Sequence, residues 1–377
     1  MAYPTDVTQP RLGVEAFEEN DAASQLSQAA FLLLLGQELK RAREGGPSRE
    51  AEEAVDPDRR LFRIPRIEFE GRRYSFLDES TRKLVDEMLL RAKQTRPERD
   101  PLHDLSRNLA FDLQRAPLER HAASLLLLCA MRFDPVVRVA AAAAAFEIAA
   151  NPLPLISILA ESTLDEDPLV RDLSATALSR IYPEHPALRR LAPPSMRGSD
   201  RPDTRTSLLV HGTFATNAAW WQPGGDFHTY LLQQVLPDLY AGSDRFDWSG
   251  GYSDAARLIA ASDLQSWLAN HNEKNPLLMG HSHGANVISL ATQLGVGTRE
   301  AVLLSCPVHW PKYAPDFSVA PNVVSIRVHM DLVILADLGG QKFIDPRIRE
   351  NVLPVWFSHP ATHDPAIWQK YNVPAML

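Results

Sequence analysis

The pattern of apolar and polar residues changes near residue 207. Beyond it, short apolar runs alternate with longer segments of helical spacing, such as residues 253–271 and 285–294. Alternation of this kind predicts an α/β domain with a mostly parallel sheet over residues 207–377. The strands that we expect lie at residues 207–210, 245–248, 276–279, 301–305, 323–328 and 352–357.

Residues 118–192 contain an internal repeat that is rich in small residues. Two Asp-Pro pairs, Asp134-Pro135 and Asp167-Pro168, stand 33 residues apart, and each is followed by a valine-arginine pair and a run of small residues. A period of that length is typical of paired-helix solenoids. Each aspartate can cap a helix whose first turn contains the proline. The region resembles HEAT repeats, whose second helix begins Asp-Pro-x-Val-Arg, and we expect an all-α, HEAT-like domain here.

The first 117 residues are charged, are interrupted by prolines and follow mostly helical spacing. The better helix candidates are residues 80–95 and 102–115, and residues 66–76 alternate around Glu-Gly in the manner of a small hairpin. We assign no chemistry to this helical region. Proline, glycine and polar residues at 193–206 mark a linker before the α/β domain.

Composition excludes several classes of function. The chain has 377 residues, with 39 Lys and Arg against 47 Asp and Glu, and a net charge of −8 does not favour nucleic acid. The apolar run at residues 31–35 is far shorter than the roughly 20 residues of a transmembrane helix. Cys129 and Cys306 lack the spacing of a disulfide framework or zinc site, and no secretory signal opens the chain. We therefore expect a cytoplasmic protein without a transmembrane segment.

The stretch Gly280-His281-Ser282-His283-Gly284 lies between an expected strand and an expected helix. That is the setting of a G-x-S-x-G nucleophile elbow, in which the serine occupies a strained backbone conformation. Side chains in place of the two glycines would collide with the neighbouring strand and helix. Ser282 is therefore the candidate nucleophile. A metal site built on His281-x-His283 is disfavoured, because Ala285 and Asn286 stand where further ligands would be needed.

A serine hydroxyl needs a histidine to remove its proton and a carboxylate to orient that histidine. Asp331 stands at the carboxyl end of the expected strand 323–328, whereas Asp337, the alternative, lies further along. Two histidines follow the last expected strand. We favour His359, which has the freer loop, and keep His363 as the second candidate.

An oxyanion hole is the remaining requirement, because negative charge develops on the former carbonyl oxygen. The backbone N–H of His283, the residue after the nucleophile, is the first expected donor. The second is the N–H of Thr213, in the loop that follows the first expected strand. Phe214, Trp220 and Trp221 come shortly afterwards and are candidates for lining a substrate pocket.

These residues together resemble the α/β-hydrolase superfamily, in particular compact lipase-like serine esterases. The resemblance covers about residues 205–377 and rests on Val-His-Gly-Thr-Phe at 210–214, the 280–284 motif, Asp331 and the late histidine. It implies hydrolysis of a small-molecule or lipid ester through an acyl-serine intermediate, without a metal or organic cofactor. Two alternatives stay open: a HEAT-type adaptor with an inactive hydrolase domain, and a thioesterase, amidase or acyltransferase that uses the same triad. A protein partner of the helical repeats is a further expectation.

Overall fold

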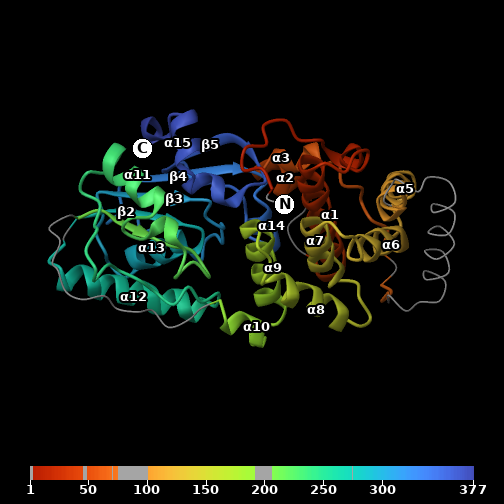
Figure 1. Ribbon diagram of the computed structural model, residues 1–377, viewed down its shortest axis with the longest axis horizontal. Coiled ribbons are helices and arrows are strands. Elements are labelled where there is room, and N and C mark those ends of the chain that lie inside the picture. Colours follow the sequence, from red (N-terminus) through yellow and green to blue (C-terminus); the bar gives the residue numbers. More distant parts are fainter. Residues whose placement is uncertain (1–2, 46–48, 70, 75–100, 192–205, 274) are drawn as a thin grey trace. The chain divides into compact units, whose positions relative to one another are not determined.

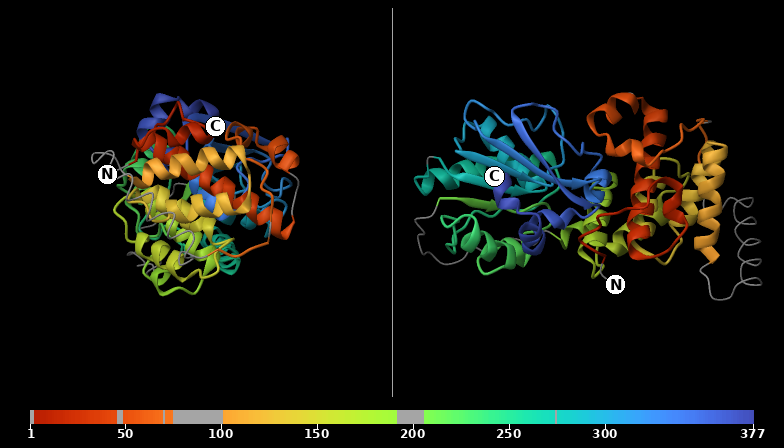
Figure 2. Two further views of the ribbon diagram at one scale, coloured as in Figure 1. Left: turned by 90° about the vertical axis from the view of Figure 1, so that its right-hand side faces the viewer. Right: turned by 90° about the horizontal axis from the view of Figure 1, so that it is seen from above.

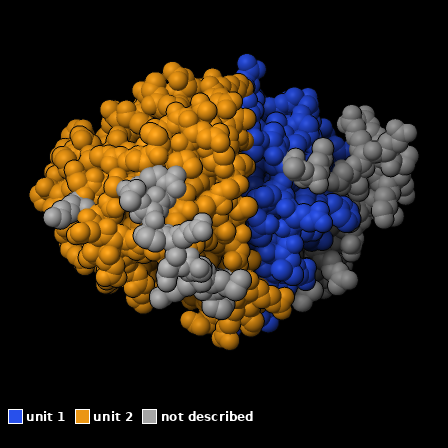
Figure 3. Space-filling model, turned by 60° about the vertical axis from the view of Figure 1, so that its left-hand side comes forward, with its two compact units in different colours: residues 1–182, 335–338 blue, residues 183–334, 339–377 orange. Residues whose placement is uncertain are grey.

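The computed structural model describes residues 3–45, 49–69, 71–74, 101–191, 206–273 and 275–377. The chain divides into two compact units, coloured separately in Figure 3. Unit 1 comprises residues 1–182 together with the short segment 335–338, and unit 2 comprises residues 183–334 and 339–377. The predicted linker at 193–206 and the predicted helix at 80–95 fall almost wholly outside the described residues.

The elements of unit 1 in its described part are helices joined by loops (Figure 1). Helix α1 (Ala22–Glu44) carries the apolar run 31–35, which is buried in the protein core. Helix α1 packs closely against α7, and a Cβ atom added to Gly36 would lie 2.7 Å from that of Ala144. The other elements among the described residues of this unit are η1 (Gly13–Phe17), α2 (Arg49–Val55), α3 (Asp58–Leu61), α5 (Pro101–Arg115), α6 (Glu119–Cys129), α7 (Pro135–Ala145), α8 (Leu153–Ser162) and α9 (Pro168–Ile181).

The two Asp-Pro pairs begin helices α7 and α9, but the two aspartates act differently. Asp167 accepts a hydrogen bond from the N–H of Leu169 at 2.8 Å, as a capping residue does. Asp134 makes no such cap bond. Its carboxylate instead accepts from the fully buried Arg132 at 2.8 Å and from Gln25 at 2.7 Å. The expectation that each aspartate caps its helix is therefore wrong for Asp134.

The hairpin predicted at residues 66–76 is also not found where the structure describes those residues. Glu68 forms an isolated bridge with Leu118, and Tyr74 forms one with Ala149. The two halves of the predicted hairpin therefore pair with loops that join helices of unit 1. Alternation along a short segment does not specify which backbone it pairs with.

Unit 2 contains one sheet of five parallel strands in the order β1-β2-β3-β4-β5, seen from two directions in Figures 1 and 2. The strands are β1 (Leu208–Val210), β2 (Leu277–His281), β3 (Glu300–Leu304), β4 (Val323–His329) and β5 (Ile348–Trp356). The other described elements are α10 (Pro186–Arg189), η2 (Ala219–Trp221), α11 (Asp226–Gln234), α12 (Asp254–Asn270), α13 (His283–Gln293), η3 (His359–His363), α15 (Pro365–Lys370) and η4 (Val373–Met376). Helix α14 (Leu332–Asp337) begins in unit 2 and ends in the segment 335–338 that is grouped with unit 1.

Helices cover both faces of this sheet (Figure 1). Successive strand residues face opposite sides, so Leu208 and Val210 pack with α12 and α13, whereas Leu209 packs with α11 and α15. A parallel sheet buried on both faces explains why its central strands read as continuous apolar runs. The predicted α/β architecture is thereby confirmed.

The predicted strand at residues 245–248 is not a strand. This stretch has no ladder pairing, and Phe246 and Trp248 are buried in the core. The Trp248 indole donates a hydrogen bond to the carbonyl of His211 at 2.9 Å. Burial of its aromatic residues, rather than pairing with a neighbouring strand, accounts for the apolar pattern.

No helix in the described ranges is both long and apolar enough to cross a bilayer.

Candidate functional site

The carboxyl ends of parallel strands meet at one edge of a sheet, and the candidate residues follow four of these ends. His211 follows β1, Ser282 follows β2, Asp331 comes two residues after β4, and His359 comes three residues after β5. The candidate residues therefore lie in loops at one edge of a single sheet, which fixes the positions of these loops.

Ser282 occupies the turn between β2 and α13, with φ of 54° and ψ of −130°. A non-glycine residue rarely adopts a positive φ, and such strain is found chiefly at functional sites. The N–H of Ser282 donates to the carbonyl of Leu304 at 2.8 Å, which ties the turn to the end of β3. Its side chain is mostly buried, with 6% of the residue exposed.

The glycines on either side of Ser282 are required by close packing. A Cβ atom on Gly280 would lie 2.6 Å from the backbone nitrogen of Ala285 in α13. A Cβ atom on Gly284 would lie 2.4 Å from the carbonyl oxygen of His211 after β1. Both approaches are to backbone atoms, which cannot move aside as a side chain can. The sharp turn and the close helix therefore depend on these two residues.

Asp331 and His359 form a buried pair. The Nδ1 of His359 lies 2.7 Å from the Oδ2 of Asp331, and neither side chain is more than 4% exposed. The other carboxylate oxygen, Oδ1, accepts from the N–H of Val333 at 3.0 Å and so caps helix α14. A carboxylate bonded to Nδ1 holds the proton on that nitrogen and leaves Nε2 as the atom able to accept one.

A glutamine that sequence reasoning missed fixes the backbone of Asp331. The side-chain oxygen of Gln341 accepts from the N–H of Asp331 at 2.9 Å, and its amide donates to the Asp331 carbonyl at 3.1 Å. Gln341 is only 4% exposed. No motif marks this residue, because its role depends on a fold that brings it back to Asp331 from ten positions away.

Three side chains converge on the backbone carbonyl of His359, and two of them were also missed. The distances to this oxygen are 3.3 Å from His281 Nε2, 3.4 Å from Ser305 Oγ and 3.5 Å from Thr362 Oγ1. The hydroxyl of Thr362 also donates to that of Ser305 at 3.1 Å. These contacts tie the backbone of His359 to the ends of β2 and β3.

His363, the alternative base, lies in an aromatic cluster. Its ring stacks on Trp220 with centroids 4.1 Å apart and meets the ring of His281 edge-on at 4.6 Å. Desolvation in this cluster, followed by repulsion from His359, lowers the pKa of His363 to about 3. The same two causes, with His363 as a third, hold the pKa of His281 well below its usual range. Both rings are therefore neutral neighbours of His359.

The predicted oxyanion donors come from two segments, the start of α13 and the loop after β1. His283 is the first residue of α13, where backbone N–H groups lack helical partners. In the loop after β1, the N–H of Phe214 donates to the carbonyl of Gly250 at 3.0 Å, whereas the N–H of Thr213 has no acceptor among the described residues. The side chains of these two residues also meet, with Thr213 Oγ1 lying 2.9 Å from His283 Nδ1.

The three aromatic residues proposed for a substrate pocket differ in their surroundings. Trp221 is 1% exposed, belongs to the core and donates its indole N–H to Ala215 at 2.7 Å. Trp220 is partly exposed and packs against His281 and His363. Phe214 follows Thr213 with a positive φ of 59°. A role in binding substrate stays a prediction for all three.

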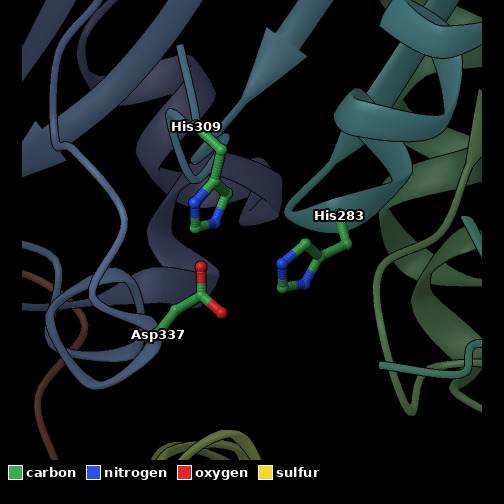
Figure 4. Close-up of side chains that lie close together, drawn as sticks. All are labelled: His283, His309 and Asp337. Atoms are coloured by element: carbon green, nitrogen blue, oxygen red, sulfur yellow. The ribbon is translucent and has the colours of Figure 1, made fainter. Parts of the chain in front are cut away.

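The ring of His283 also faces His309, with nearly parallel planes and centroids 6.4 Å apart (Figure 4). Figure 4 draws these rings with Asp337, which belongs to the segment grouped with unit 1. Among the described residues of unit 2 taken alone, no three His, Cys, Asp or Glu side chains come close enough to share a metal ion.

Comparison with known families agrees with this architecture. Residues 208–376 match the model of the alpha/beta hydrolase family. These residues form an alpha/beta hydrolase domain. The hydrolase domain lies within the region in which sequence motifs predicted this fold, and the triad and oxyanion residues proposed above all fall inside the matched range. No curated protein sequence matches the chain.

Six chains of solved structures are also similar to this one. Among them is a structure described as that of an arylesterase, with 13% sequence identity and a TM-score of 0.30. The similarity covers 56% of this chain and 98% of that chain.

Proposed function

We propose that the protein is a serine hydrolase that cleaves carboxylic esters, lipid esters included, through an acyl-serine intermediate. The observation that carries the proposal is the buried 2.7 Å contact between His359 and Asp331 at the same sheet edge as Ser282. An acid–imidazole pair and a serine on a strained turn are the groups that activate a hydroxyl for acyl transfer when they come together.

In the proposed reaction the Oγ of Ser282 attacks the ester carbonyl while His359 Nε2 takes the hydroxyl proton. Asp331 stabilises the imidazolium that forms, and the N–H groups of His283 and Thr213 bind the developing oxyanion. His359 then donates the proton to the leaving alcohol, which departs and leaves an acyl-serine. A water molecule, deprotonated by His359, attacks the acyl carbon, and collapse of the second intermediate releases the acid and restores Ser282.

His359 is the base in this proposal, and His363 is not. His359 is bonded to a carboxylate, whereas the interactions described for the His363 ring are with Trp220, Phe227 and His281. A ring whose pKa is about 3 is also a weak proton acceptor. The related thioesterase, amidase and acyltransferase activities would use the same residues and differ in the leaving group or acceptor.

A fluorophosphonate probe and a short-chain ester test the proposal on the purified protein. We expect wild type to be labelled, Ser282→Ala to be unlabelled, and Asp331→Asn to lose about 10³- to 10⁴-fold in kcat with little change in KM. His359→Ala should lose activity to a similar extent. His363→Ala is the matched control, being the other late histidine, and should keep most of its kcat.

Two outcomes would contradict the proposal. One is a folded wild type that neither reacts with the probe nor hydrolyses any ester in a chain-length series. The other is undiminished labelling of Ser282→Ala, which would place the reactive nucleophile elsewhere. Equal loss in His359→Ala and His363→Ala would leave the nucleophile in place but refute the assignment of the base.

A further inference from the structure

A pocket that the proposed mechanism does not use lies at the outer edge of strand β1 in unit 2. β1 is the first strand in the order of the sheet, and both Leu208 and Leu209 line the pocket. These neighbours face opposite sides of the sheet, so a pocket that touches both lies beside the edge of the strand. The pocket offers about 240 Å³ of space, part of which is open to solvent. The described residues that line it include none of the proposed catalytic or oxyanion residues.

Arg245 brings a positive charge to this pocket. Its guanidinium carbon lies over the ring of Trp221, 4.7 Å from the centroid, and both residues line the pocket. The face of an indole attracts a cation but offers no oxygen to its N–H groups. The Nε of Arg245 is shielded from solvent and has no hydrogen-bond partner among the described residues. A shielded donor without an acceptor costs free energy, and such a group points to a water, ion or ligand that satisfies it.

The acidic residues near this arginine in the chain bond elsewhere. Asp244 accepts from the hydroxyl of Tyr240 at 2.6 Å with Oδ1, and its Oδ2 lies 2.9 Å from Nε2 of His271. The Oδ1 of Asp247 lies 2.8 Å from Nε2 of His211. In the part of the chain that the structure describes, no acidic residue lines the pocket. The guanidinium therefore presents its charge to the pocket without a carboxylate of the protein beside it.

The walls of the pocket indicate which class of anion fits. Leu208, Leu209, Pro223 and Phe246 present apolar surface, and they lie with the indole of Trp221 around a single guanidinium. A phosphate group has more oxygens to satisfy than one arginine can bind, whereas the parallel N–H groups of a guanidinium match the two oxygens of a carboxylate. An apolar wall favours a ligand that carries a short hydrocarbon chain behind its charged group.

We infer that this pocket is a binding site for a small aliphatic monocarboxylate. The guanidinium of Arg245 binds the carboxylate, and the hydrocarbon chain lies against the apolar wall beside Trp221 and Phe246. The inference goes beyond the proposed function and does not depend on it, because the pocket and the proposed catalytic residues share no side chain.

The first test compares butyrate with butyramide, its uncharged analogue, on the full-length protein. Saturation-transfer NMR titration should give a Kd of about 1–10 mM for butyrate, as expected for a ligand with so few atoms. Butyramide should bind at least about tenfold more weakly, because it lacks the charge-assisted bond to the guanidinium. Equal affinity for the two ligands would overturn the inference, as would the absence of saturable binding of butyrate.

The second test places the site. Arg245→Met keeps an unbranched apolar stem beside Trp221 but removes the guanidinium, so the Kd for butyrate should rise by about 10- to 100-fold. The matched control is Arg347→Met. Arg347 also lies over an aromatic ring, 3.9 Å from the centroid of Phe317, but it pairs with Asp345 at 2.7 Å. Its variant should keep the wild-type Kd. An unchanged Kd in Arg245→Met, or equal weakening in both variants, would overturn the inference.

A second variant keeps the site testable if Arg245→Met does not fold. Arg245→Lys retains the charge but lacks the planar pair of N–H groups, so butyrate should bind about tenfold more weakly, and an unchanged Kd would overturn the inference. Inorganic phosphate, added in competition, should displace butyrate only weakly, and tighter binding of phosphate would overturn the class of ligand. Failure of the proposed function has a separate signature, since the protein would then bind butyrate and yet not react with a fluorophosphonate.

Discussion

The histidines around Ser282 show how one residue type takes different roles in one site. His359 is bonded to a carboxylate, whereas His363 is stacked on Trp220 and its pKa is lowered to about 3. Sequence order alone could not separate them, because both follow β5 within eight residues. The difference lies in their surroundings, which a linear pattern does not contain.

The lowered pKa of His363 has a consequence for stability. In the unfolded chain its ring takes a proton near pH 6.5, whereas the folded protein resists this until about pH 3. Between these values the unfolded state binds the extra proton, so the free energy of unfolding falls as pH falls and is fully retained above pH 6.5. We expect this one group to contribute about 1 kcal/mol or less per pH unit, given its partial exposure.

Urea unfolding at pH 7 and pH 5 measures this effect. His363→Phe keeps an aromatic ring against Trp220 and removes the proton site, so its free energy of unfolding should fall less than that of wild type over this interval. His281 remains in the variant and keeps its own contribution, which leaves a shallower but nonzero dependence. An identical decrease in wild type and His363→Phe would show that His363 is not held neutral by its surroundings.

Among the helices and strands, the sequence predicts best those elements whose apolar and polar pattern matches their burial in the fold. The strand-to-helix turn at Ser282 was predictable because the motif places a glycine at each position where the backbone approaches too closely for a side chain. β5 begins at Ile348 and not at the predicted residue 352. The apolar pattern missed its first residues because β5 is an edge strand and several of these residues are polar. Gln341, Ser305 and Thr362 could not be predicted, since their contacts join segments distant in sequence.

The two Asp-Pro pairs in unit 1 yield a prediction at the scale of helices. Asp134 and Asp167 occupy equivalent positions, yet Asp134 pairs with the fully buried Arg132 and Asp167 caps α9. Loss of a cap costs about 1 kcal/mol, whereas a buried charge left without its partner costs about 3–5 kcal/mol. We therefore expect Asp134→Ala to be destabilised by about 2 kcal/mol or more beyond Asp167→Ala.

The two variants serve as controls for each other, because both remove a carboxylate at the start of a helix. Their free energies of unfolding, measured in urea at pH 7, give the comparison directly. Equal destabilisation would mean that Gln28 and Ser106, which accept hydrogen bonds from Arg132 at 2.7 Å and 3.2 Å, are enough to stabilise its buried charge without Asp134. Labelling by the fluorophosphonate should be unaffected in both, since neither aspartate lies in unit 2.

For the whole molecule, the division into two units indicates which part of the chain carries the proposed catalytic residues. Ser282, Asp331, His359 and both proposed oxyanion donors all belong to unit 2, as do Gln341 and the paired His211 and Asp247. Unit 1 supplies none of the proposed catalytic residues. If the hydrolase domain is self-sufficient in chemistry, a fragment of residues 183–377 should react with a fluorophosphonate at Ser282 at a rate within about tenfold of the full chain.

The fragment must first be shown to fold, since it carries residues 335–338, which group with unit 1. Within unit 1, Gln37 and Arg180 donate to carbonyls of that segment at 3.0 Å and 3.1 Å. Circular dichroism and a cooperative thermal transition establish folding, and Ser282→Ala in the same fragment establishes the site of labelling. A folded fragment that does not react, beside a full chain that does, would mean that the helical unit takes part in forming the reactive site.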